Sequence, residues 1–263
     1  MRANLNTKVH VPIPIPSPVH EMQFHIRNST DFKFCVAVFA YDISVLKRKL
    51  AIARKYKPDL VELRLDYLRN LDETTIREVE NLARKDILMT LRSKAEGGNS
   101  YLDESKRVEL IERFVTFPNC LVDVEIDTLK DTPGLVDMLE SSSAKVIASY
   151  HNFSRTPSQK ELMRLIKSAP SGKWLHAIKI ACRANSFEDN RRILSLYAST
   201  ALRRVRPVNL IAFCMGEQGV FSRFASLYYG SPFTYASLPG EATAPGQLDV
   251  VTMRAALGMS AEV

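Results

Sequence analysis

Residues 175–181 read LHAIKIA, a short apolar run of the kind that forms a buried β-strand. A parallel strand that is covered on both faces is nearly continuous in apolar residues. One charged residue, Lys179, interrupts this run between Ile178 and Ile180. The stretch therefore predicts a buried strand, and it makes the lysine the first candidate for function.

Runs of the same kind recur along the chain, and segments with helical periodicity lie between them. The runs begin about 28 residues apart on average, which is the length of one strand-plus-helix unit. The eight runs cover residues 34–39, 60–63, 87–91, 121–126, 146–149, 175–180, 208–213 and 233–236. The helix-like segments include residues 43–54, 75–84, 104–116, 158–168 and 191–200.

Eight strands that alternate with helices predict an α/β fold, the (β/α)8 TIM barrel. An open, doubly wound sheet is the alternative, and it is expected to carry a glycine-rich turn after its first strand. Here that turn reads FAYD at residues 39–42, and neither a dinucleotide fingerprint nor a P-loop occurs elsewhere. The sequence therefore favours the barrel.

The chain divides into an N-terminal arm, residues 1–30, and the barrel, residues 31–263, which is the expected catalytic domain. Residues 11–16 read VPIPIP, and alternating prolines exclude both a helix and a central strand. Residues 19–26 are a candidate for a short capping strand. No apolar run is long enough to cross a membrane, and the N-terminus lacks the apolar core of a signal peptide.

The charged and cysteine residues point to a protein without metal, disulfide or nucleic acid. The net charge is +7, but the basic residues are scattered, with the densest groups at residues 47–49 and 203–204 on expected helices. A mild positive field favours a small anionic substrate. The cysteines are not spaced as metal or disulfide pairs, so we expect buried thiols: Cys35, Cys120, Cys182 and Cys214.

Polar residues stand near the carboxyl ends of five expected strands, where apolar residues are normal. Residues two apart on a strand share a face, so the side chains of Glu62 and Arg64 point the same way, as do those of Asp123 and Glu125. If the faces point inward, the charges converge at the end of the barrel that carries active sites, and they must pair or bind a ligand. The polar residues are Glu62, Arg64, Thr90, Arg92, Asp123, Glu125, Ser149, His151 and Lys179, with Glu96 just beyond the third strand.

Each of these residues also has a structural interpretation. The pair Glu62 and Arg64 could be a buried ion pair, and His151 could be a satisfied core residue. Lys179 could reach between helices if it faced outward. Facing inward with other cations near, its amine should have a lowered pKa and form imines with ketones. The simultaneous pattern over five strands favours a catalytic site.

In these motifs the sequence resembles type I 3-dehydroquinate dehydratase, an enzyme of the shikimate pathway. The similarity extends over residues 33–257, with the motifs in the family's order. The matching segments read VELRLD at 61–66, TLRSKAEGG at 90–98, DVE at 123–125, SYHNF at 149–153 with TP at 156–157, KIA at 179–181, MGEQGVFSR at 215–223 and APGQ at 244–247.

The resemblance implies that water is eliminated from 3-dehydroquinate through a Schiff base, without a metal or organic cofactor. Lys179 corresponds to the Schiff-base lysine, His151 to the general acid and base, and Glu96 to the carboxylate that orients the histidine. An imidazole pKa near neutrality would suit both proton transfers. The remaining matched positions bind substrate: Glu62, Arg64, Arg92, Arg223, Thr243 and Gln247.

The resemblance further implies a cytoplasmic enzyme that forms a homodimer. Some relatives carry a shikimate dehydrogenase domain downstream, and we expect none here because the chain ends just after the eighth helix. The chain departs from the family at Ala37 and Thr243, where serine is frequent, and in Cys182 and Arg183 after the lysine motif.

Two other functions stay open on the sequence alone. A class I aldolase would share Lys179 but not the set of Arg92, Glu96 and Arg223. A catalytically silent barrel that binds a ligand would need none of the residues for chemistry. Nucleic-acid binding lacks a recognition motif.

Overall fold

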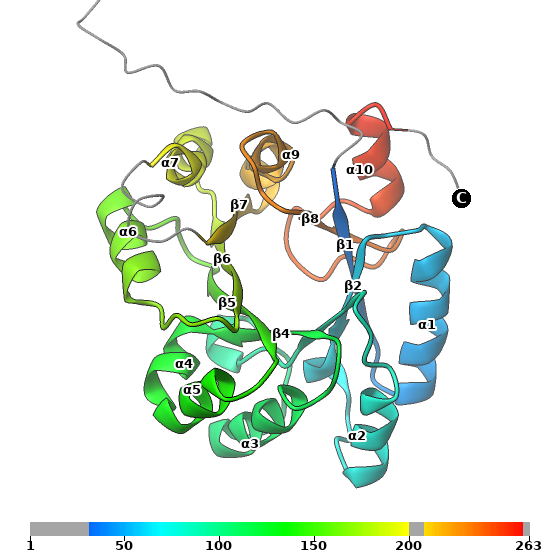
Figure 1. The fold of residues 1–263 in the computed structure, drawn as a ribbon. Coiled ribbons are helices and arrows are strands. Elements are labelled where there is room, and N and C mark those ends of the chain that lie inside the picture. The colour runs from blue at the N-terminus through cyan, green and yellow to red at the C-terminus, as the bar shows by residue number, and fades with distance from the viewer. Residues whose placement is uncertain (1–31, 200–207, 260–263) are drawn as a thin grey trace, which may run out of the picture.

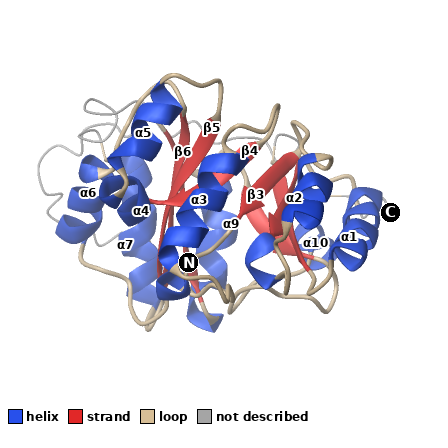
Figure 2. Ribbon diagram, turned by 90° about the horizontal axis from the view of Figure 1, so that it is seen from below, coloured by secondary structure: helices blue, strands red, loops and turns tan. Residues whose placement is uncertain are grey.

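The computed structural model describes residues 32–199 and 208–259, and in these ranges the chain forms a barrel of parallel strands encircled by helices (Figure 1). Seen from the side, the strands form the centre and the helices cover them (Figure 2). The predicted N-terminal arm, its capping strand and the basic pair at 203–204 lie outside the described residues.

The elements follow the strand–helix alternation that the sequence predicts. The strands are β1 (Phe34–Phe39), β2 (Leu60–Arg64), β3 (Ile87–Thr90), β4 (Leu121–Glu125), β5 (Lys145–Asn152), β6 (Leu175–Arg183), β7 (Asn209–Met215) and β8 (Thr234–Ser237). The helices are α1 (Ile43–Lys55), α2 (Glu73–Glu80), α3 (Glu104–Phe114), α4 (Ile126–Asp131), α5 (Pro133–Glu140), α6 (Gln159–Ser168), α7 (Phe187–Ala198), α9 (Val220–Tyr228) and α10 (Val250–Ala256), with short 3-10 turns η2 (Leu65–Tyr67), η3 (Lys94–Glu96) and η4 (Glu217–Gly219).

The strands pair in parallel in the order β7-β6-β5-β4-β3-β2-β1-β8. Strands that follow each other from β1 to β7 are neighbours in space, and β8 pairs with β1, where Cys35 lies opposite Tyr235, so that only β7 and β8 among the described strands are not joined by backbone pairing. Between β7 and β8 the rings of Phe213 and Tyr235 lie 6.0 Å apart, so side chains close the seam. The predicted TIM barrel is confirmed, and the sheet lacks the reversal of strand order that marks a doubly wound fold.

Two apolar layers support the site, one outside the strands and one inside. The outer layer packs strand residues such as Val61 and Ile180 against the helices. The inner layer fills the lower part of the barrel, where Leu88 pairs with Leu121. Two residues further along the same strands the interior becomes polar, because Thr90 pairs with Asp123. The polar layer thus lies on an apolar plug, at the carboxyl ends of the strands.

The structure extends or divides some of the predicted elements. Strand β5 continues to Asn152 and β6 to Arg183, so His151 lies within a strand. Two helices follow β4, because Pro133 begins α5 at the first helical turn, where its missing N–H costs nothing. Four other helices begin at an aspartate whose side chain accepts backbone N–H groups: Asp42, Asp72, Asp103 and Asp249.

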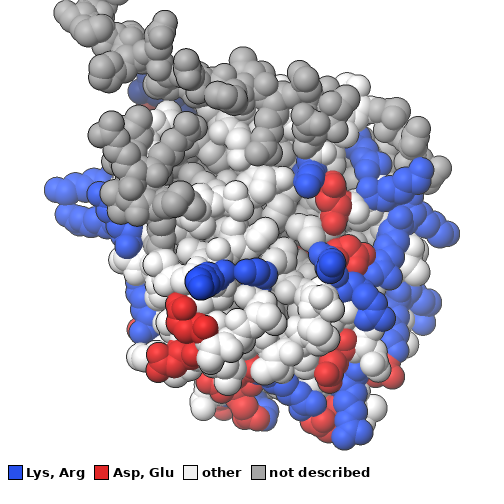
Figure 3. Space-filling view, viewed as in Figure 1, with Lys and Arg blue, Asp and Glu red and all other residues white. Residues whose placement is uncertain are grey.

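Basic side chains gather on the side of the molecule where α1 lies, with acidic ones among them (Figure 3). Lys47 pairs with Glu78, and Lys49 lies 2.7 Å from Glu241. This arrangement fits the predicted solvated face. Within the described ranges no helix is long and apolar enough to span a membrane, and no three His, Cys, Asp or Glu side chains are grouped to hold a metal ion.

Candidate active site

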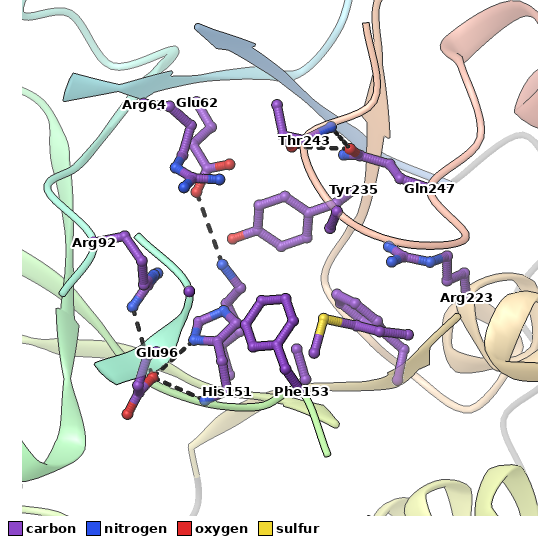
Figure 4. A pocket seen from close by; sticks show the side chains of 16 residues that line it. Glu62, Arg64, Arg92, Glu96, His151, Phe153, Arg223, Tyr235, Thr243 and Gln247 are labelled. Carbon is purple, nitrogen blue, oxygen red and sulfur yellow. Dashed lines mark hydrogen bonds and ion pairs between the residues drawn. The ribbon is translucent and has the colours of Figure 1, made fainter. Parts of the chain in front are cut away.

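All nine residues proposed from the sequence line one pocket at the carboxyl end of the barrel (Figure 4). They come from β2, β5 and β6, from the loop after β3, from α9 and from the loop after β8. Seven further residues complete the lining: Gly97, Phe153, Ala181, Phe213, Met215, Tyr235 and Ala244. The fold thus brings these nine side chains to one pocket, although they lie up to 185 positions apart, from Glu62 to Gln247.

Lys179 lines this pocket and is only 4% exposed. Its Nζ donates a hydrogen bond to Asp123 Oδ2 at 3.1 Å and lies 3.8 Å from Glu62 Oε1. The amine also lies 4.2 Å from the centre of the Tyr235 ring. The expectation that cations surround the lysine is wrong, because Asp123 of β4 and Glu62 of β2 turn their carboxylates toward it across the barrel. These carboxylates stabilise a positive charge on its nitrogen.

Asp123 connects the lysine to a second buried cation. Arg92 donates to Asp123 Oδ1 at 2.7 Å, and the Ser149 hydroxyl donates to the same oxygen. Burial alone would raise the pKa of Asp123, but the charges of Arg92 and Lys179 lower it to about 2. Asp123 is therefore ionised at any pH at which the enzyme is expected to work.

Glu125 extends this network away from the pocket. Its carboxylate accepts from Arg92 at 2.7 Å and from the backbone N–H of Ser93 at 3.0 Å. On the other side it accepts from Arg107 of α3 at 2.8 Å, and Arg107 also donates to the carbonyl oxygen of Leu91 at 3.0 Å. Each buried charge thus has partners, as buried charges require.

His151 is held by Glu96, the last residue of η3. The imidazole Nδ1 lies 2.9 Å from Glu96 Oε2, and the backbone N–H of His151 donates to the same oxygen at 2.8 Å. Because a backbone N–H can only donate, Oε2 is an acceptor. We therefore assign the proton to Nδ1, which leaves the Nε2 lone pair free for the pocket.

The electrostatic surroundings change the expected titration of this pair. Burial, together with the charges of Arg92, Lys179 and Arg64, lowers the pKa of His151 well below its usual value. The expectation of an imidazole pKa near neutrality is therefore corrected, since the histidine is a neutral base at pH 7. Burial also raises the pKa of Glu96 to about 8, against the opposing effect of Arg92.

Glu62 and Arg64 do not pair with each other in the manner that a structural interpretation required. Arg64 makes two hydrogen bonds of 2.8 Å to Asp66, which follows it in η2. Glu62 accepts from the Thr90 hydroxyl at 2.8 Å and faces Lys179. The two side chains share the inward face of β2, as their spacing predicts.

Arg223 differs from the other charged residues because it makes no ion pair with any described residue. Its side chain is 1% exposed and stacks on Phe213, 4.6 Å from the ring centre. One amino group donates to the carbonyl oxygen of Pro245 at 3.3 Å, and Nε has no partner among the described residues. Burial lowers its pKa to about 10, so it is still charged at pH 7. A buried guanidinium beside a pocket, with no ion-pair partner among the described residues, has the charge and the donors that suit an anion.

The loop after β8 brings Thr243 and Gln247 to the same side. The Gln247 side-chain oxygen accepts from the Thr243 backbone and hydroxyl at 2.7 and 2.8 Å, which leaves its amide N–H groups for a ligand. The loop is tied to β7, since the backbone N–H of Gly216 donates to Pro245 at 2.9 Å. A Cβ at Gly246 would lie 2.3 Å from the Gly216 oxygen, so only glycine permits this contact.

Phe153 narrows the opposite side of the pocket, next to His151. Its ring packs on Gly97, where a Cβ would lie 2.3 Å from the ring edge. Gly97 also has a φ of +81°, which ends the turn that carries Glu96. A glycine at this position therefore serves both the carboxylate and the aromatic side chain.

Sequence reasoning left Phe213, Met215 and Tyr235 out of the site. Phe213 and Tyr235 are aromatic residues in predicted strands, where they are common, and Met215 lies just beyond the predicted run 208–213, in the extension of β7. Their spacing of two could have found them, because Phe213 and Met215 share the inward face of β7. Tyr235 carried no such signal, since its strand contains no charged residue.

A TIM barrel whose pocket holds a buried lysine beside two carboxylates, a histidine and an arginine without an ion pair has the features of an enzyme that forms imines with small anionic carbonyl compounds. Comparison with known proteins specifies the family. The model of the type I 3-dehydroquinase family matches residues 34–263, and the chain belongs to this family. It is therefore a lyase of the hydro-lyase class, as the resemblance implied.

Relatives with the same activity in their names match over most of their length. The chain is 36% identical to the 3-dehydroquinate dehydratase of Pyrococcus abyssi, over 82% of this chain and 94% of the relative. It is 30% identical to that of Methanothermobacter thermautotrophicus, over 86% and 96%. The crystal structure of 3-dehydroquinate dehydratase from Geobacillus kaustophilus superposes with a TM-score of 0.74 at 30% identity, over 87% of this chain and 91% of that one.

A structure described as dehydroquinate dehydratase and shikimate dehydrogenase from S. pombe shares the fold, with a TM-score of 0.69 at 23% identity. The match covers 94% of this chain but 47% of that one. The predicted existence of fused relatives is thereby confirmed for that protein.

Proposed function

We propose that the chain converts 3-dehydroquinate to 3-dehydroshikimate through a Schiff base on Lys179, with His151 as general base and acid. The observation that carries the proposal is that the lysine, the neutral histidine and the unpaired guanidinium of Arg223 line one pocket. The lysine reacts with the ketone of the substrate. Arg223 offers its charge to the carboxylate, together with the amide of Gln247.

In the first step the lone pair of Lys179 Nζ forms a bond to the C3 carbonyl carbon. The ketone oxygen takes up two protons and leaves as water, so that a protonated imine remains. Asp123 and Glu62, 3.1 and 3.8 Å from Nζ in the free enzyme, are the counter-ions of this cation. Asp123 suits that role because it is ionised.

In the second step the cationic imine acidifies the neighbouring C2 position. His151 Nε2 takes a C2 proton, and the electron pair of that bond forms the enamine as the imine pair moves onto nitrogen. The enamine then expels the C1 hydroxyl, which leaves as water with the proton that His151 returns. Hydrolysis of the imine releases the product, so the sum is the loss of one water molecule.

Glu96 orients the imidazole through its two hydrogen bonds, and Thr243 orients Gln247. Glu62, Arg64 and Arg92 face the part of the pocket where the ring hydroxyls of the substrate would lie. Arg92 already donates to Asp123, Glu125 and Ser149, so it also holds the counter-ion in place.

The enone absorbance of 3-dehydroshikimate tests this proposal. The absorbance should grow when the chain is mixed with 3-dehydroquinate, and it should not grow with quinate, which lacks the ketone. A Lys179→Met variant should be inactive with either compound. Enone formation by that variant, or none by the wild-type chain, would contradict the proposal.

We also propose a cytoplasmic homodimer that acts on a small anionic substrate, without nucleic acid. The four cysteines are free thiols, which suits a reducing compartment. The net charge of +7 would attract the anion. Sedimentation velocity tests the dimer. Twice the mass of the chain is expected, and the mass of one chain at micromolar concentration would contradict the proposal.

A further inference from the structure

Tyr235 of β8 is a buried polar residue that the proposed mechanism does not use. Its side chain is 3% exposed, and its hydroxyl has no hydrogen-bond partner among the described residues. A buried phenol usually donates a hydrogen bond, and an unmade one is costly. The hydroxyl therefore has no partner among the described residues, and a ligand in the pocket can supply one.

The ring and the hydroxyl of Tyr235 both face the lysine end of the pocket. The Lys179 Nζ lies over the ring at 4.2 Å from its centre. In Figure 4 the hydroxyl points toward the side of Glu62 and away from Gln247. The side chain of Tyr235 thus lies next to the reactive nitrogen of Lys179, away from Arg223 and Gln247, which are proposed to bind the substrate carboxylate.

Neighbouring aromatic rings fix this orientation. The Tyr235 ring lies 6.0 Å from that of Phe213 and 5.5 Å from that of Phe233. Burial and the charges of Glu62 and Asp123 raise the pKa of the phenol well above its usual value. The hydroxyl is therefore a positioned donor that keeps its proton at neutral pH.

A second buried tyrosine shows what a structural role looks like in this barrel. The Tyr197 hydroxyl donates to the carbonyl oxygen of Ala212 at 3.2 Å and accepts from its N–H at 2.7 Å. Tyr197 does not line the pocket. The protein satisfies that phenol completely, whereas it leaves the phenol beside the lysine unsatisfied.

We propose that Tyr235 is a further catalytic residue, which acts during imine formation and so rests on the proposed function. Its ring face stabilises the cationic nitrogen of Lys179. Its hydroxyl donates a hydrogen bond to the ketone oxygen as the C–N bond forms and the carbonyl π pair moves onto that oxygen. The oxygen then leaves as water with two protons from the original ammonium group, and the phenol keeps its own proton.

The test is the rate of imine formation, measured by mixing enzyme and 3-dehydroquinate, quenching with borohydride at increasing times and weighing the adduct by mass spectrometry. Tyr235→Phe keeps the ring and removes the hydroxyl, and it should slow imine formation about 10- to 100-fold, the equivalent of one hydrogen bond to a developing charge. Tyr235→Leu also removes the ring and should slow it about a further 10-fold. The control Tyr197→Phe should lower the unfolding temperature and leave the rate unchanged.

The variants separate the two roles from each other and from the proposed function. A rate for Tyr235→Phe equal to that of the wild type would overturn the role of the hydroxyl, whether or not the leucine variant folds. Equal rates for the phenylalanine and leucine variants would overturn the role of the ring. Absence of any adduct on Lys179 of the wild-type chain would refute the proposed function itself.

Discussion

The two sides of the pocket differ in how far the protein satisfies its own charges. On β3 to β6 and in the loop after β3, Arg92, Asp123 and Lys179 pair with one another, and we call these residues the paired side. On α9 and β8, Arg223 and Tyr235 keep buried polar atoms without described partners, and we call these residues the unpaired side. The paired side is complete in the free protein, and under the proposed function the substrate would complete the unpaired side.

This difference predicts which substitutions should destabilise the fold and which should weaken substrate binding alone. Breaking a buried ion pair leaves an uncompensated charge and destabilises the protein. Removing a buried charge that has no ion-pair partner relieves an unfavourable burial, so the ligand loses more by it than the fold does. The two sides should therefore respond oppositely when one charge is removed.

The largest expected effect is on turnover, when the base next to the paired side is removed. His151→Ala should lower kcat about 10²- to 10⁴-fold, because general acid–base catalysis contributes that much. The imine should still form, since Lys179 is unchanged, and borohydride trapping together with the enone assay measures both. His176→Ala, at the opposite end of β6, is the control and should leave turnover unchanged. Wild-type turnover of His151→Ala would remove the histidine from the mechanism.

Asp123→Asn should destabilise the paired side. It keeps the shape of the side chain but leaves Arg92 and Lys179 short of a counter-charge. The free energy of unfolding should fall by about 3–5 kcal/mol. Chemical denaturation measures it, and a loss below about 1 kcal/mol would show that the network tolerates the missing charge.

Arg223→Met should weaken substrate binding without destabilising the fold, the opposite of the effect of Asp123→Asn. The free energy of unfolding should stay the same or rise, since a buried guanidinium without an ion-pair partner is replaced by an apolar side chain of similar length. KM should rise about 10- to 100-fold, the equivalent of one charge-assisted hydrogen bond. Steady-state kinetics and denaturation are compared for the same preparation. A clear loss of stability with an unchanged KM would place Arg223 among the structural residues.

The smallest expected effect is the pH dependence of stability caused by Glu96. Its folded pKa is raised to about 8, so the folded state holds a proton that the unfolded state has lost. Stability from this group is fully present below its usual pKa and is lost as pH rises to about 8. In the unfolded state His151 has its ordinary pKa of 6.5 and is half protonated at that pH, which opposes the decline. The slope is therefore measured above about pH 7, where it should be at most about 1.4 kcal/mol per pH unit. Denaturation of wild type and Glu96→Gln at several pH values tests this, since the variant should lack the slope.

The barrel and the charged residues that line the pocket could be predicted from the sequence, but the pairing among those residues could not. The apolar runs give the strands, and a spacing of two gives the shared faces of Glu62 with Arg64 and Asp123 with Glu125. Which side chain meets which depends on the register between strands and on rotamers, so the link from Arg92 to Asp123 was not foreseen. The lowered pKa of His151 has the same origin, because it comes from burial and from charges on other strands.

Tyr235 and Arg107 show a second limit of sequence reasoning. Tyr235 is an ordinary strand residue until its neighbours are known, and Arg107 is an ordinary residue of a charged helix. Only the structure shows that the first has an unsatisfied hydroxyl and that the second donates to Glu125. A residue whose role depends on its contact with another residue cannot be recognised from its position in the sequence alone.

The most direct test of the central claim is the site of the covalent adduct. The wild-type chain is incubated with 3-dehydroquinate, reduced with borohydride, digested and analysed by tandem mass spectrometry, with quinate as the control compound. The account predicts one adduct, on Lys179, and none with quinate. An adduct on another lysine, or full activity without any adduct, would contradict it.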